Sequence, residues 1–413
     1  MRFRQFLATP LRRLKSELAA FLSRRDPAEY FIALMLSGLS VFFVRCLVGG
    51  SESFVGIFFK GGNDLFMDYF NSLRDVAQGV GVYTERHVIY PPLANLLLLV
   101  IARVIPTAYL ETGGFPMNLT WRAYPAAVLS VTFFFLVAML LLFAVMQREQ
   151  HHTVNKTLLL LLLLVSFPVL ALIERGNIVI LALIALLLFM QGYDSPRRAE
   201  RELALFMLAV AAALKLYPAL FGLLLLGERR YRELSRAALY TLALLLLPSF
   251  FFGGPICLWW VIENTLAYSR YTAGASALSG YPILLYLLYA AGLFLVTYAA
   301  FLQKKPWKLW LLISALLLSI PSIFSSYNWL LTLPALLAFL RTERLCGTNW
   351  IYFFLLTIPS FTYLPEALQG NTLVALIAGI FLISLLELFW LCPLFRHKRR
   401  RHEASHALSQ MDE

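Results

Sequence analysis

Apolar stretches of about twenty residues recur along the whole chain, and this recurrence constrains the fold more than any other feature. The chain has 413 residues, of which 60% are hydrophobic and 14% are charged. A soluble domain carries about 25% charged residues, so this chain has too few charges to cover a water-exposed surface. A stretch of about 20 apolar residues crosses the hydrocarbon core of a bilayer as a helix. We therefore expect an all-α polytopic membrane protein.

The apolar pattern predicts about twelve membrane segments between residues 30 and 391. The segments cover residues 30–49, 90–110, 122–146, 157–173, 178–192, 203–226, 237–262, 281–302, 309–325, 329–340, 350–365 and 372–391.

The positions of Lys and Arg predict the orientation of these segments. The connectors 1–29, 147–156, 193–202, 227–236, 303–308, 341–349 and 392–413 hold 26 of the 35 Lys and Arg residues. Such residues stay on the cytoplasmic side of a cell membrane. We expect both termini there, with residues 1–29 as a basic amphipathic segment on the membrane lipids and residues 392–413 as a basic tail. The net charge of +12 thus reports topology and does not indicate nucleic-acid binding.

Placing every basic connector inside has two consequences. Residues 50–121 form one long first external loop, so the apolar stretch 90–110 lies in the membrane interface as a helix without crossing. Residues 203–226 enter and return as a short re-entrant hairpin, because both flanks are basic and the segment is too short for two spans. Pro218 breaks the helix near the hairpin tip.

Ionisable residues within a membrane domain are costly and indicate function. Here they gather on the external side. The residues in question are Asp64, Asp68 and Tyr90 in the first loop, Arg175 and Asn177 in a polar turn at 174–177, Lys215 and Tyr217 at the hairpin tip, and Arg270 in a loop at 263–280. Asn328 marks a further external turn. A single external site explains this distribution with the fewest assumptions.

The residue types fit group transfer from an anionic lipid-linked donor. A carboxylate can accept the proton of an acceptor hydroxyl, and cations can bind a phosphate leaving group and offset its developing charge. A divalent cation held by Asp64 and Asp68 is an alternative, although no third ligand is evident. The four cysteines have no CxxC spacing, so no zinc site is indicated.

Each feature also has a plain structural interpretation. Glu174 and Arg175 can form a local ion pair in their turn. Lys215 can extend outward along the membrane, as long cationic side chains do, and Arg270 can contact lipid headgroups. Glu387, near the inner end of the last segment, is expected to extend toward the interface in the same way.

Three other functions are alternatives to group transfer. A transporter or flippase of a lipid-linked sugar would need ionisable residues near the midplane in two matched halves, and the sequence has no internal repeat. A glycan polymerase or ligase calls for large late external loops, which are short here. A scaffold would leave the external carboxylates and cations without an explanation.

Three motifs resemble glycosyltransferase family 87, whose members are multi-span enzymes of the GT-C superfamily that use polyprenyl-phosphate sugars. The first is Asp64-Leu65-Phe66-Met67-Asp68-Tyr69-Phe70, followed by Tyr83 and by Tyr90-Pro91-Pro92. The others are Arg175-Gly176-Asn177 after Pro168, and Lys215-Leu216-Tyr217-Pro218. The similarity in order and spacing extends over residues 30–230.

The resemblance implies a GT-C fold and an inverting transfer with one catalytic aspartate in the first external loop. By motif position this residue is Asp64, and position 68 is more often aromatic in the family, which leaves open which aspartate is the base. A hexose, with mannose as the leading guess, would pass from a polyprenyl-phosphate donor to a glycolipid or cell-envelope glycan. Arg175, Lys215 and Arg270 are expected to bind the donor phosphate, and Tyr90, Asn177 and Tyr217 other parts of the substrates.

Overall fold

The computed structural model describes residues 26–55, 65–77, 79–105, 124–149, 156–274, 282–364 and 366–391, all of it helix or connecting segments without a strand. The first half contains α2 (Pro27–Val55), α3 (Met67–Ala77), η1 (Gly79–Val82), α4 (Pro92–Ala102), α6 (Pro125–Glu149), α7 (Lys156–Leu164), α8 (Phe167–Arg175), α9 (Val179–Gly192) and α10 (Arg198–Leu214). The second half contains η4 (Tyr217–Gly222), α11 (Leu223–Gly227), α12 (Tyr231–Ser249), η5 (Phe250–Phe252), α13 (Cys257–Gly274), α14 (Pro282–Leu302), α15 (Pro306–Leu318), η6 (Tyr327–Thr332), α16 (Leu333–Thr342), α17 (Asn349–Phe361) and α18 (Glu366–Leu391).

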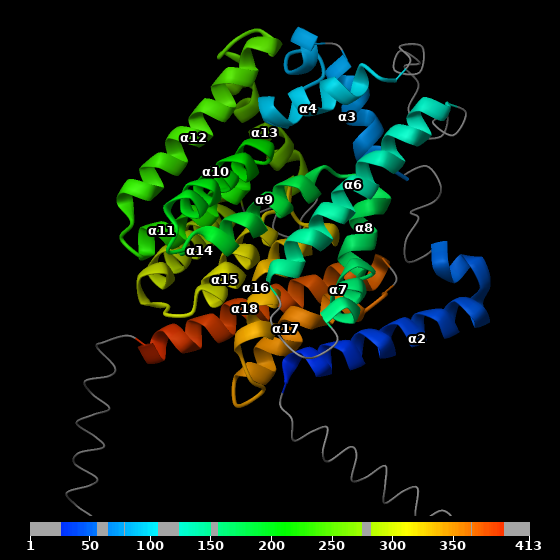
Figure 1. Cartoon of the computed structure of the whole chain (residues 1–413), viewed down its shortest axis with the longest axis vertical. Helices are drawn as coiled ribbons and strands as arrows, with labels where there is room; N and C mark the ends of the chain where they lie inside the picture. The colour runs from blue at the N-terminus through cyan, green and yellow to red at the C-terminus, as the bar shows by residue number, and fades with distance from the viewer. Residues whose placement is uncertain are drawn as a thin grey trace, which may run out of the picture.

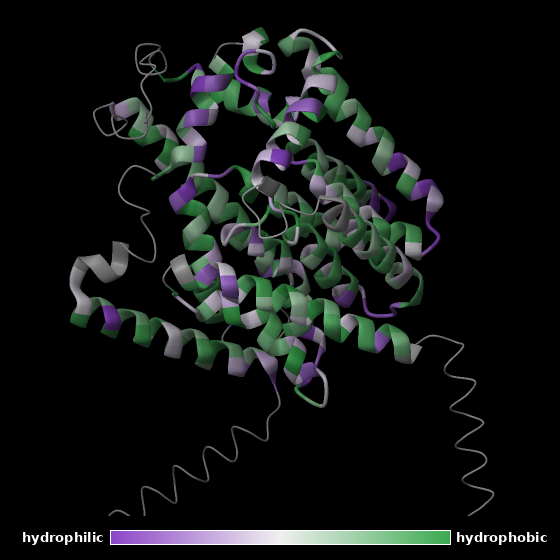
Figure 2. Cartoon of the chain, turned by 180° about the vertical axis from the view of Figure 1, so that it is seen from behind, coloured by the Kyte–Doolittle hydropathy of each residue, from purple (hydrophilic) through white to green (hydrophobic). Residues whose placement is uncertain are grey.

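The expectation of an all-α chain with membrane helices is confirmed for these residues. Four helices are long and apolar enough to cross a membrane, namely Pro27–Gly50, Pro125–Arg148, Tyr231–Phe252 and Leu368–Phe389. The pair α7 and α8, bent by 43°, makes a fifth candidate span. Six further apolar helices are only 10–17 residues long, so the count of about twelve membrane segments stays a prediction. Hydrophilic residues lie mainly at helix ends and in connectors (Figure 2).

One predicted segment differs from the structure. Residues 237–262 do not form a single helix, because α12 ends at Ser249 and the chain turns before α13 begins at Cys257. Gly253 and Gly254 have φ values of 92° and 88°, a backbone conformation that glycine adopts without strain. The predicted loop at 263–280 is wrong for the same reason, because α13 continues through Arg270 to Gly274.

The first loop contributes two short helices that lie at one end of the bundle, where α4 packs against α12 and α10, and α3 packs against α4 and α8 (Figure 1). The 11 residues of α4 reach about 16 Å as a helix, about half the thickness of a hydrocarbon core. Helix α3 is amphipathic and buries one face, made of Tyr69, Phe70, Leu73 and Val76. The boundary of the loop at 50–121 stays a prediction, because residues 56–64 and 106–123 lie outside the described residues.

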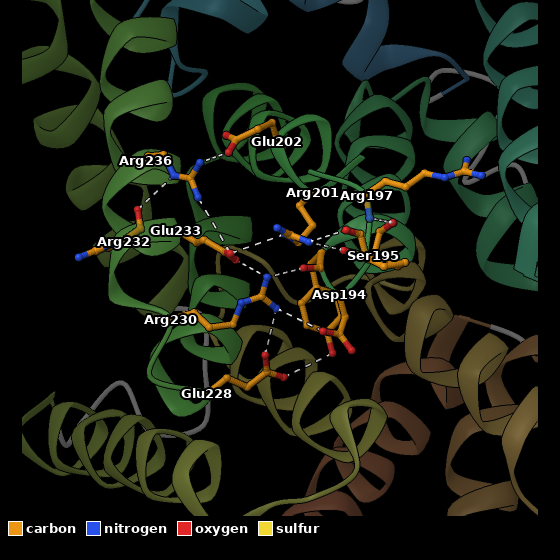
Figure 3. Close-up of polar contacts among 12 residues, drawn as sticks. Asp194, Ser195, Arg197, Arg201, Glu202, Glu228, Arg230, Arg232, Glu233 and Arg236 are labelled. Atoms are coloured by element: carbon orange, nitrogen blue, oxygen red, sulfur yellow. Dashed lines mark hydrogen bonds and ion pairs between the residues drawn. The ribbon is translucent and has the colours of Figure 1, made fainter. Parts of the chain in front are cut away.

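The segment 203–226 changes direction at Lys215. Helix α10 ends at Leu214, and Lys215 is extended, with φ −147° and ψ 126°. Pro218 then stands in the first turn of η4, where its missing N–H costs no helical hydrogen bond. A network of ion pairs joins the other ends of this segment, and Figure 3 shows Arg230 and Arg236 reaching Glu233 and Glu202 there. Re-entry of this segment into a membrane stays a prediction.

Candidate functional site

The turn after α8 brings the first loop against the bundle. Gly176 caps α8 with φ 71° and ψ 28°, and its backbone N–H bonds the carbonyls of Leu172 and Ile173. The N–H of Phe66 donates to the carbonyl of Glu174 at 2.6 Å. A Cβ atom on Gly176 would lie only 2.9 Å from Tyr69 Cβ. Glycine therefore permits both the left-handed cap and the close approach of α3.

Asp68, in the first turn of α3, is held by both polar residues of this turn. Its Oδ1 accepts a hydrogen bond from Arg175 Nη2 at 2.7 Å, and its Oδ2 accepts one from Asn177 Nδ2 at 2.7 Å. The Asp68 side chain is 17% exposed and that of Arg175 is 27% exposed, so solvent screens this ion pair only in part. Arg175 thus pairs across 107 residues of sequence, which goes beyond the local pair expected with Glu174.

The side chain of Asn177 is held in place by the first residue of α9. Its Oδ1 accepts a hydrogen bond from the N–H of Val179 at 2.9 Å, so its amide nitrogen must face Asp68. The same Nδ2 lies 3.2 Å from the Tyr327 hydroxyl and 3.5 Å from the Tyr90 hydroxyl. Asn177 is 3% exposed. A single buried amide therefore joins α3, the segment before α4, and η6.

The change of chain direction at Lys215 adds a second cation. Lys215 Nζ lies 3.8 Å from the centroid of the Tyr90 ring, a cation–π contact. Tyr217 OH lies 3.4 Å from Asn328 Oδ1, and Asn328 Nδ2 donates to the carbonyl of Ile323 at 2.6 Å. The residues Asp68, Tyr90, Arg175, Asn177, Lys215, Tyr217, Tyr327 and Asn328 are from here on called the Asp68 cluster.

Tyr90 is itself held by a scaffold of buried amides. Tyr83 OH donates to the carbonyl of Tyr90 at 3.0 Å, and Asn95 Nδ2 donates to Tyr83 OH at 2.9 Å. From α13, Asn264 Nδ2 reaches the carbonyls of Tyr83 at 2.9 Å and Val88 at 3.2 Å. The loop that presents Tyr90 is therefore positioned by helices on two sides.

Six of the eight predicted site residues belong to this cluster. Asp64 lies outside the described residues. Arg270 is exposed on α13, and no hydrogen bond or ion pair within the described ranges joins it to the cluster. Sequence reasoning missed Tyr327. The signal that could have found it is its neighbour Asn328, a polar residue between two apolar stretches.

The described residues also bear on the alternative of a bound cation. Among them, no three His, Cys, Asp or Glu side chains come together as a metal-ligand group. An arginine and an amide donate to Asp68, and the same amide also donates to the hydroxyls of Tyr90 and Tyr327. Such a shell, rich in N–H and O–H donors, suits an anion or a hydroxylated ligand.

The sequence profile of glycosyltransferase family 87 matches residues 88–320, more than half of the chain. The chain belongs to glycosyltransferase family 87. The resemblance to this family is thereby confirmed, and the chain is a glycosyltransferase by family. The match extends further toward the C-terminus than the predicted range 30–230, and residues 64–70 and Tyr83 of the first motif precede it. The comparisons with curated proteins and with solved structures found no match.

The match of family 87 covers most of the cluster. Tyr90, Arg175, Asn177, Lys215 and Tyr217 lie within the matched residues, whereas Asp68 precedes them and Tyr327 and Asn328 follow them. For a family 87 glycosyltransferase, the cluster offers one carboxylate, two cations and several hydroxyl and amide groups within a few ångströms of one another. These are the groups that a transfer between two hydroxylated substrates requires.

Proposed function

We propose that this glycosyltransferase has a GT-C fold and moves a hexose, with mannose as the leading candidate, from a polyprenyl-phosphate sugar to a hydroxyl of a glycolipid or cell-envelope glycan. The reaction takes place at the external face of a cell membrane, with both termini in the cytoplasm. The observation that carries the proposal is the Asp68 cluster, in which a carboxylate lies beside Arg175 while Lys215 lies on the Tyr90 ring.

The proposed reaction is a single displacement that inverts the anomeric carbon. The acceptor oxygen forms a bond to this carbon while the bond from the carbon to the phosphate oxygen breaks. An aspartate takes the proton of the acceptor hydroxyl, and polyprenyl phosphate leaves with the electron pair. A positioned base contributes about 10²–10⁴-fold to the rate of such a step.

By motif position Asp64 is the proposed base, and Asp68 is the other candidate. Each Asp68 oxygen accepts one hydrogen bond from its partners and has a second lone-pair position for a substrate hydroxyl. Arrival of the donor would let Arg175 exchange part of its contact with Asp68 for the phosphate. A guanidinium has five N–H donors, so it can bind both anions.

Lys215 is the second proposed phosphate ligand. It lies at the end of α10, at the point where the chain reverses, and its ammonium group rests on the Tyr90 ring. Tyr90, Asn177 and Tyr217 would contact the sugar or the phosphate through their hydroxyl and amide groups. Arg270 is exposed on α13, where it would bind the donor phosphate only as the donor approaches from outside the cluster.

The test is transfer of labelled mannose from polyprenyl-phosphate mannose by membranes that contain the chain. Asp64→Asn and Asp68→Asn are assayed beside Asp75→Asn, a matched control on α3 whose carboxylate pairs with Arg74. We expect Asp64→Asn to lose at least 100-fold in kcat and Asp75→Asn to stay near wild type. Undiminished transfer by both Asp64→Asn and Asp68→Asn would exclude an aspartate base in this loop. Wild-type membranes that transfer no hexose from any polyprenyl-phosphate donor would exclude the donor class.

A further inference from the structure

A cavity with polar and apolar walls lies at the end of the helices that is opposite to the Asp68 cluster. It has a volume of about 710 Å³, within the size range of ligand sites. Its wall comes from the C-terminal end of α9, the connector 194–196, the segment before α15, and the last two turns of α16. Figure 3 shows this connector, with Asp194 and Ser195 beside Arg201 and Arg230.

Helix α10 separates this cavity from the Asp68 cluster. Glu200, in its first turn, lines the cavity, whereas Lys215 follows its last residue in the Asp68 cluster. A helix of 17 residues is about 25 Å long. The cavity is therefore not part of the proposed transfer site.

Asp194 in the cavity wall is largely exposed and lies 3.7 Å from Arg230 Nη1, whereas the other two acidic groups of the wall are engaged more closely. Both oxygens of Glu343 accept hydrogen bonds from Lys305 at 2.7 Å, and Trp307 Nε1 donates to one of them at 3.0 Å. Glu200 accepts bonds from Ser195 and Arg197. These carboxylates therefore offer a ligand few further acceptor positions.

The cationic groups of the wall remain able to donate. Lys304, in the connector before α15, and Arg341, in the last turn of α16, are both exposed and line the cavity. An arginine has five N–H donors and a lysine has three, so single contacts do not exhaust them. These two side chains therefore present donors and positive charge, which suit an anion.

The inner wall is apolar but contains two unsatisfied polar atoms. Leu187 and Leu337 line it together with Trp310, which is 6% exposed. Trp310 Nε1 and Gln191 Oε1 are buried and have no hydrogen-bond partner among the described residues. An elongated ligand with a polar linkage behind its anionic end would pair with them after small side-chain shifts.

We propose that this cavity binds an acidic lipid, with its phosphate at Lys304 and Arg341 and the start of its apolar chain against Leu187, Trp310 and Leu337. The chemistry that the cavity recognises is an anion attached to an apolar group. Neither a neutral lipid nor a free phosphate ester combines both parts.

The experiment measures binding to the purified full-length chain by native mass spectrometry. The three probes are phosphatidylglycerol, phosphatidylcholine with the same acyl chains, and glycerol 3-phosphate. Lys304→Glu with Arg341→Glu is compared with a matched control of equal charge change, Arg198→Glu with Arg344→Glu. Arg198 begins α10 and Arg344 follows α16; both are exposed and neither lines the cavity. Ala338→Trp fills the cavity from its partly exposed wall without a change of charge.

We expect the wild-type chain to retain phosphatidylglycerol at least ten-fold better than phosphatidylcholine. Lys304→Glu with Arg341→Glu and, separately, Ala338→Trp should each lose this preference, while the matched control keeps it. Thermal unfolding of each variant checks its fold. Equal retention of the two lipids, equal losses in the cavity and control variants, or binding of glycerol 3-phosphate as tight as that of phosphatidylglycerol would each overturn the proposal. None of these outcomes depends on transferase activity.

Discussion

Asp68 Oδ1 lies 2.7 Å from Arg175 Nη2, and this contact closes the first loop onto the end of α8. The backbone bond from Phe66 N–H to the Glu174 carbonyl runs beside it. The side chains of Arg175 and Asp68 are mostly buried. A mostly buried ion pair holds its geometry better than an exposed pair. The site is thus assembled by contacts between segments that are distant in sequence.

Asn177→Asp tests the direction in which the Asn177 amide points. The substitution places a second carboxylate against Asp68, whereas Asn177→Ala only removes the donor. Like charges in contact repel, so we expect Asn177→Asp to lose about ten-fold more transfer activity than Asn177→Ala. The transfer assay with labelled donor measures this difference. Equal activity of the two variants would contradict the assigned orientation.

Gly176→Ala should destabilise the fold by about 1–3 kcal/mol, because an L-residue is strained at φ 71° and the added Cβ would meet Tyr69. Gly79→Ala is the matched control. Gly79 has φ 64°, but nothing lies within 4 Å of an added Cβ there. Thermal unfolding in detergent should therefore show a larger loss for Gly176→Ala. Equal losses would show that backbone strain alone accounts for the effect.

Asn264→Ala should weaken substrate binding without touching the cluster. It removes the donor to the Tyr83 and Val88 carbonyls, which are left with fewer partners at a cost of about 1–3 kcal/mol. The loop that carries Tyr90 should then be less ordered, and we expect KM to rise more than kcat falls. Thr265→Val is the control, because Thr265 bonds only the Val261 carbonyl of its own helix. A change in kcat alone would contradict a positioning role for Asn264.

Lys308 and Glu387 form an ion pair between α15 and α18, with Lys308 Nζ at 2.6 and 2.7 Å from the two carboxylate oxygens. Glu387 is therefore paired within the bundle, and the expectation that it extends toward the interface is wrong. Both side chains are mostly buried, at 11% and 18% exposed. Lys308→Met or Glu387→Met alone should cost about 3 kcal/mol, because each leaves one charge unpaired. The double variant should recover most of this loss in thermal unfolding, and additive losses would contradict the pairing.

The environment of the Glu343 carboxyl group predicts how the stability of the fold depends on pH. Burial raises its pKa, but hydrogen bonds from Lys305, Trp307 and Asn349 outweigh burial and hold the pKa below its ordinary value. A carboxyl group whose pKa is lowered by folding stabilises the folded state above its unfolded pKa of about 4.3, and this contribution is lost as the pH falls through the folded pKa. Glu343→Gln should therefore be less stable than wild type at pH 7, and the difference should shrink below about pH 4. A constant difference would contradict the shift.

The sequence by itself determined the all-α membrane class, the family, and the places along the chain where polar residues interrupt apolar ones. These properties follow from local composition, because each apolar stretch meets the requirement of a bilayer on its own. The polar turn at 174–177 and the reversal at Lys215 were visible in the same way.

Only the tertiary structure decided which polar residues meet. Asn177 reaches Tyr327 across 150 residues, and Lys308 reaches Glu387 across 79. In the sequence, Arg270 and Lys215 are both isolated cations outside the basic connectors. The chain turns at Gly253 and Gly254 before a new helix begins, and Arg270 is exposed on that helix. Hydropathy sums over a segment, whereas a contact depends on how each helix is rotated, bent and packed against others. That information lies in the whole fold and not in any one segment.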